Sequence, residues 1–312
     1  NAGGTTSLTK GNANNGTNET ENRQAFLTFG DKSWGSVKVG KDLGIFGSTA
    51  ILNDMTLLGV GGGAGGGGAN TTLGGIGTGY LYADWIGQIA YTTPNMNGFQ
   101  ATLGLMQPWN ANTTLSAAQA AGVSSASTGT SDEFGYQGQA SFSWTGDFAG
   151  KVWGGFFLQQ VSNVGGAANG DGVGGTEDAE AFEVGVSTSI YNIGLVGYAY
   201  TGEGVGTTIL LGDAFDANGS KRDSDGGYVQ ATYVIPTGTK LGVSYGISTL
   251  DANTVDKNTT LVEDNERVTI GAYHPLTKHL NLVAEYNNME SKAQNGNKRE
   301  SDTISLGAIL FF

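Results

Sequence analysis

The sequence contains no cysteine, which excludes a disulfide framework and any thiolate metal site. Proline is scarce, with 4 residues among 312, whereas glycine is abundant, with 54. Strand-type runs recur between the glycines, so the composition is unlike that of a disordered linker. No apolar run approaches the roughly 18 residues that a membrane-spanning helix needs. The chain is therefore either soluble or crosses a membrane as β-strands.

Basic residues are also few. There are 15 Lys and Arg against 28 Asp and Glu, which gives a net charge of −13 and a pI near 4.4. Such a chain has no basic stripe to neutralise phosphates, so nucleic acid is excluded as a partner. The acids gather in residues 171–180, 213–225 and 251–266, and the segments between are nearly neutral. This spacing separates polar loops from strands.

Alternation with a period of two residues is the main structural signal. Between residues 240 and 250, Leu241 and Val243 project to one face and Gly242 and Ser244 to the other. The same pattern predicts thirteen strands, at residues 23–29, 36–41, 85–93, 99–107, 134–144, 151–161, 181–190, 193–201, 228–235, 240–250, 267–274, 280–289 and 302–312.

Short and long connections alternate between these strands, with long connections at residues 42–84, 108–133, 162–178, 202–225, 251–266 and 290–301. All short turns then fall at one end of the sheet, which is the layout of an outer-membrane β-barrel. A soluble β-sandwich is the alternative, but the uncharged, glycine-rich polar face favours an all-β transmembrane antiparallel barrel. We predict one domain over residues 1–312, with residues 1–22 as an external loop and 302–312 as the last strand.

The connection at residues 42–84 is far longer than usual, is rich in glycine, and carries one acid in its interior, Asp54. Glycine lets a backbone lie close against a wall and still turn. We predict that this segment folds into the lumen of the barrel and narrows it.

Four stretches resemble one known family. They are Arg23-Gln24-Ala25-Phe26, the strand from Gly35 to Lys41, Asn53-Asp54-Met55, and the final Leu310-Phe311-Phe312. They are similar to the general porins of Gram-negative outer membranes, which are trimers of sixteen-stranded barrels. The resemblance implies an outer-membrane location, a homotrimer, and contact with outer-membrane lipid and lipopolysaccharide.

The resemblance also bears on the strand count. The strand after Asn22 resembles the fourth strand of the family, and the long connection after residue 41 resembles its third, constriction loop. It implies that three strands precede the thirteen in the intact protein and are absent from this sequence. An extra strand within residues 5–10 is the alternative.

The resemblance implies a set of pore-constriction residues. Arg23 and Lys41 fall on basic wall positions, and Asp54 falls on the acidic loop position. The strand alternation independently allows Lys38 to face the lumen. For Arg23 and Lys41, a side chain that extends to the membrane interface is the alternative.

Glu183 and Glu285 occupy lumen-facing positions of their strands, and we expect them to make the vestibule negative. The sequence thus predicts a passive diffusion channel for small hydrophilic solutes and ions with weak cation selectivity. The alternative is a substrate-selective channel for sugars or organic acids. Its mark would be a ladder of aromatic or basic lumen residues, whereas the lumen positions are mostly Gly, Ser, Thr and Gln.

No motif indicates an enzyme, a cofactor or a metal site. Residues 61–66 have the glycine spacing of a dinucleotide site, but neither a following helix nor a βαβ unit is expected. Asp216 begins a stretch like a calcium loop, yet Lys221 stands where its glycine should be. His274 and His279 flank one turn without a third ligand near in sequence.

Overall fold

The computed structural model describes residues 22–60, 74–111, 129–131, 133–165 and 174–312. Its strands form one antiparallel sheet in which each strand pairs with its neighbours in the chain, from β1 to β13. The strands are β1 (Ala25–Asp31), β2 (Gly35–Leu43), β3 (Trp85–Thr92), β4 (Phe99–Met106), β5 (Gly135–Trp144), β6 (Phe148–Val164), β7 (Gly175–Ile190), β8 (Ile193–Glu203), β9 (Asp223–Val234), β10 (Lys240–Leu250), β11 (Val262–Thr277), β12 (Leu280–Ala293) and β13 (Lys298–Leu310). The all-β antiparallel prediction is confirmed.

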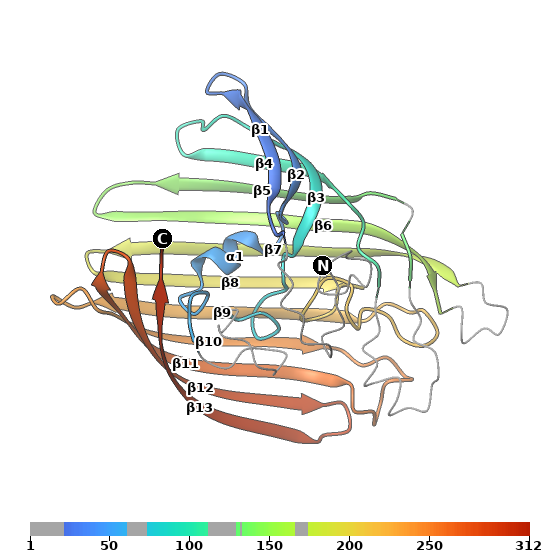
Figure 1. Ribbon diagram of the computed structural model, residues 1–312. Helices are drawn as coiled ribbons and strands as arrows, with labels where there is room; N and C mark the ends of the chain where they lie inside the picture. Colours follow the sequence, from blue (N-terminus) through green and yellow to red (C-terminus); the bar gives the residue numbers. More distant parts are fainter. Residues whose placement is uncertain (1–21, 61–73, 112–128, 132, 166–173) are drawn as a thin grey trace.

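The tight turns from β3–β4 to β11–β12 lie on the left in Figure 1 and the β1–β2 turn lies at the top, whereas the β8–β9 and β10–β11 connections and the β12–β13 turn lie on the right. The connections before β7, β9, β11 and β13 are shorter than predicted, because these strands begin at Gly175, Asp223, Val262 and Lys298. Residues 290–301 are a hairpin around Gly296, whose φ is 80°. The polar ends of these strands still pair with the neighbouring strands beyond the apolar belt. They could not be predicted, because apolar and polar residues no longer alternate there.

The two faces of the sheet differ in chemistry. Ile304 and Leu306 of β13 are 78% and 79% exposed on one face, whereas Thr303 and Ser305 lie on the other. We call these the outer and the inner face. An apolar outer face and a polar inner face are the arrangement of a transmembrane barrel. No helix among the described residues is long and apolar enough to cross a membrane.

β1 and β13 are the two ends of the strand order, and the sheet is open between them over the residues that the structure describes. The predicted external loop at residues 1–22 lies outside the described residues except for Asn22.

The long connection begins at Gly44, since β2 continues to Leu43. It contains the helix α1 (Ser48–Asn53), which is too short for its periodicity to show in the sequence. Its described residues, 44–60 and 74–84, lie against the inner face, where Phe46 and Ala50 are fully buried together with Phe157 of β6. The prediction that it folds into the lumen is confirmed, and we call residues 44–84 the constriction loop.

Candidate pore constriction

Inner-face side chains form hydrogen bonds with the backbone of the first arm of the constriction loop, residues 44–60. Gln137 of β5 accepts hydrogen bonds with its Oε1 from the N–H groups of Ile45 at 2.7 Å and Phe46 at 3.0 Å. Glu183 of β7 accepts a bond of 2.9 Å from the N–H of Gly47, the N-cap residue of α1. These bonds satisfy donors that an infolded loop would otherwise bury without a partner.

The end of α1 is held from β9. Gln230 accepts a hydrogen bond of 2.7 Å from the N–H of Met55 and donates one of 3.1 Å to the carbonyl of Asn53. The Tyr228 hydroxyl donates to the carbonyl of Ala50 at 2.8 Å. Gln230 therefore binds both the carbonyl group that precedes Asp54 and the N–H group that follows it, at the C-terminal end of α1.

The returning arm of the loop, residues 74–84, lies against β10. The Ser248 hydroxyl accepts a bond of 2.9 Å from the N–H of Gly79. A Cβ added at Gly246 would lie 2.1 Å from the carbonyl oxygen of Thr78, which is too close for any side chain. Glycine at this wall position is what lets the two backbones approach.

Asp54 joins the two arms of the loop. Its Oδ1 accepts bonds of 2.8 Å from both the N–H and the hydroxyl of Thr56. Its Oδ2 accepts bonds from the N–H of Gly75 at 2.6 Å and the hydroxyl of Tyr80 at 2.8 Å. Burial, and then the neighbouring Asp54 carboxylate, raise the pKa of Tyr80, so this phenol keeps its proton and donates it.

Arg267 of β11 connects this cluster to the wall. Its Nη1 donates to the carbonyl of Gly74 at 2.6 Å, and its Nη2 donates to the Thr56 hydroxyl at 2.9 Å. The same Nη2 lies 3.8 Å from Oδ2 of Asp54, and both side chains are almost fully buried. Asp54 and Arg267 therefore link the two arms of the loop to each other and to the sheet. We call this pair the latch.

An infolded loop fastened across the inner face of a single antiparallel sheet is the geometry of a porin constriction, and the comparisons agree. The family model of Gram-negative porins matches residues 1–294. The chain belongs to the Gram-negative porin family. It is therefore an outer-membrane channel protein, and the family points to a channel rather than an enzyme.

Solved structures show the same fold. The outer membrane channel DcaP of Acinetobacter baumannii has a TM-score of 0.64 at 13% identity, covering 88% of this chain and 71% of that one. The anion-selective porin from Comamonas acidovorans has a TM-score of 0.60 at 15% identity, covering 97% and 80%. The in-vitro folded trimer form of OmpT from Vibrio cholerae has 0.51 at 18%, covering 92% and 78%. The search of curated proteins gives no match.

The porin's predicted wall cations lie on different faces. Lys38 is on the inner face, where it pairs with Asp42. Lys41 shares the outer face with Val39, opposite to the side expected of a pore-wall cation, because successive strand residues alternate. Arg23 is exposed just before β1. The constriction role of these residues stays a prediction, which the register supports for Lys38 and not for Lys41.

Glu183 and Glu285 occupy inner-face positions of the porin but are only 5% and 2% exposed. Glu285 accepts bonds from the N–H of Val60 at 3.0 Å and the hydroxyl of Tyr273 at 2.6 Å. Together with the bond from Gly47 to Glu183, these contacts direct both carboxylates at the constriction loop. Neither faces open water as a vestibule acid would.

Sequence reasoning missed the porin's loop anchors and its inner aromatic residues. Arg267 could have been found, since the alternation that places Gly271 inside also places Arg267 inside. Trp153 of β6 and Tyr198 of β8 are large inner-face aromatics where mostly small residues were expected. They are buried in the core between loop and wall, and so pack the constriction loop rather than form a ladder along the pore.

Proposed function

We propose that this porin is a passive diffusion channel for small hydrophilic solutes and ions. The observation that supports this most is the constriction loop, whose backbone is hydrogen-bonded to inner-face side chains from β5 to β12. These hydrogen bonds fix the loop in place, so that it narrows the polar lumen and does not move to block it. Passage then depends on solute size and charge.

We assign the weak cation selectivity to the external end of the barrel. The chain carries a net charge of −13, and exposed acids lie on outer-face positions at the external ends of β9 and β13, at Asp223, Asp225, Glu300 and Asp302. Acids around the external rim of the barrel raise the local concentration of cations there and lower that of anions, although their side chains do not line the lumen. Asp54, Glu183 and Glu285 contribute less to this field, because loop donors and Arg267 occupy their oxygens.

The proposed assembly is a homotrimer in contact with outer-membrane lipid and lipopolysaccharide. The apolar outer face supports lipid contact, with Leu103, Ile89 and Val184 all more than half exposed. The trimer form of OmpT is a structure of the same fold.

Single-channel recording in planar lipid bilayers tests this function. We expect currents proportional to salt concentration and, under a salt gradient, a reversal potential that favours cations. Liposome swelling should be faster for small than for large sugars and should not saturate. Saturation by one sugar or organic acid would instead support a substrate-selective channel, and absence of any conductance would refute the channel.

A further inference from the structure

The connection between β8 and β9, residues 204–222, is buried although it belongs to the external end of the sheet. We call it the mouth loop. Val205 and Leu211 have no exposed surface, and Leu210 and Phe215 are 3% and 5% exposed. External connections normally run over the surface in water. This one is packed as a compact element of the molecule.

The mouth loop contacts the constriction loop directly. The N–H of Tyr82 donates a bond of 2.9 Å to the carbonyl of Thr208. Tyr82 and Ile209 also form a parallel β-bridge. The constriction loop is therefore held by the wall through its anchors and by the mouth loop through this bridge.

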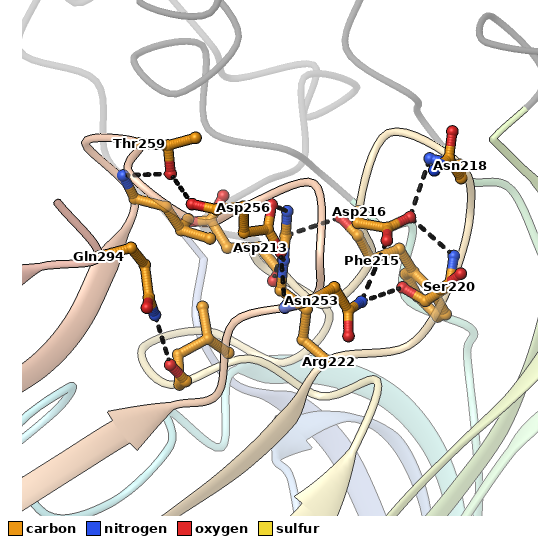
Figure 2. A network of polar contacts seen from close by, with 12 residues as sticks. Asp213, Phe215, Asp216, Asn218, Ser220, Arg222, Asn253, Asp256, Thr259 and Gln294 are labelled. Carbon is orange, nitrogen blue, oxygen red and sulfur yellow. Dashed lines mark hydrogen bonds and ion pairs between the residues drawn. The ribbon is translucent and has the colours of Figure 1, made fainter.

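One arginine fixes the shape of the mouth loop. Arg222 is 4% exposed, and its Nη1 donates to the carbonyls of Asp213 at 2.8 Å and Phe215 at 2.7 Å. Its Nε and Nη2 both donate to the Asp256 carboxylate, each at 2.7 Å (Figure 2). Two parallel bonds between a guanidinium and a carboxylate set geometry as well as attraction.

Asp256 lies in the β10–β11 connection, so the pair joins two external loops. A second link runs from Nδ2 of Asn253 to Oδ2 of Asp216 at 3.1 Å (Figure 2). The β12–β13 turn joins the same network, since the N–H of Asn295 donates to the carbonyl of Thr259 at 2.9 Å. Three external connections thus form one bonded rim.

We infer that Arg222 is a positioning residue for solute size selection, because its pairing with Asp256 holds the mouth loop as a second constriction above the first. This inference rests on the proposed diffusion channel. Loss of either charge leaves the other buried without its partner, which destabilises the packed loop. The hydrogen bond from Tyr82 to Thr208 and the bridge between Tyr82 and Ile209 then no longer support the constriction loop from the external side.

The test uses R222Q, D256N and the double variant in the full chain, with K221Q as the matched control. Lys221 carries the same charge in the same loop, but its side chain pairs with Glu203 at 2.8 Å, and only its backbone carbonyl accepts a bond from the network, from Asn253. Liposome swelling with neutral sugars of increasing size measures the cut-off without a charge effect. Open-channel current noise in bilayers reports loop motion.

We expect R222Q and D256N to shift the cut-off to larger sugars and to raise the current noise, and K221Q to do neither. The double variant should resemble the single variants, since both lose the same pair. Unchanged cut-off and noise in R222Q and D256N, or an equal effect in K221Q, would overturn the inference. Should R222Q not fold, D256N and N253A decide the question. N253A removes the side-chain bonds of Asn253 to Asp216 and to the carbonyls of Ser220 and Lys221 but keeps the Arg222–Asp256 pair.

The two proposals fail in different ways. If the wild-type protein does not conduct at all, the diffusion channel is refuted. If the wild-type protein conducts and R222Q and D256N sieve sugars as it does, only the role of Arg222 is refuted.

Discussion

At the scale of single residues, the latch of Asp54 and Arg267 decides how the constriction loop is held. The two side chains are 2% and 4% exposed and lie 3.8 Å apart, and the Asp54 carboxylate also accepts four hydrogen bonds from three residues. A carboxylate in this setting mainly holds the loop in place and contributes less to the electric field in the pore. Its removal should therefore affect stability more than selectivity.

We predict that D54N lowers the free energy of unfolding by about 3–5 kcal/mol, because Arg267 would stay buried without its counter-charge. Urea unfolding in lipid vesicles measures this. D223N is the control, because Asp223 is an exposed acid at the start of β9. A D54N protein with wild-type stability and a reversal potential shifted away from cations would show instead that Asp54 acts as a pore acid.

The limits of sequence reasoning are clear at these positions. The unusual length of the connection at residues 42–84 placed Asp54 in a loop, the resemblance assigned it to an acidic loop position, and the alternation placed Glu183 and Glu285 on the inner face. The partners of these acids could not be predicted, since Arg267 is 213 residues from Asp54 and Val60 is 225 residues from Glu285. Whether a carboxylate faces water or a backbone N–H depends on such distant contacts.

At the scale of elements, the close approach of the constriction loop to β10 depends on a wall position without a side chain. We predict that G246A displaces the returning arm, because its Cβ would lie 2.1 Å from the backbone oxygen of Thr78. Overpacking of this kind costs about 1–3 kcal/mol. The displacement should change single-channel conductance and raise current noise.

G197A is the matched control, since a Cβ there would lie 3.8 Å from Val186, an ordinary contact. Both variants place alanine in a strand interior and so change strand propensity alike. Equal conductance in wild type, G246A and G197A would mean that the loop does not lie on β10 as the structure shows.

The elements themselves were predictable to different degrees. All thirteen strands were predicted, because each has an apolar outer face over the membrane belt. The polar extensions of β7 and β11 were not, since beyond that belt the outer face is no longer apolar. The burial of the mouth loop was not predicted either. It depends on contacts with the wall and with the constriction loop, and a glycine-rich sequence does not show such contacts.

At the scale of the whole molecule, the central claim is that the inner face of the sheet lines a water-filled pore and the outer face contacts lipid. The strand register assigns neighbouring residues to opposite sides. Thr102 of β4 is half-buried on the inner face, and Leu103 is 58% exposed on the outer face. The native chain has no cysteine, so a single introduced thiol reports one site without background.

The most direct measurement is the effect of a charged, membrane-impermeant thiol reagent on single-channel current in T102C and L103C. The wild-type current should not respond. The T102C current should fall on labelling, because the added group occupies the lumen, and the L103C current should stay constant. Equal responses of T102C and L103C, or a response of L103C alone, would contradict a pore lined by the inner face.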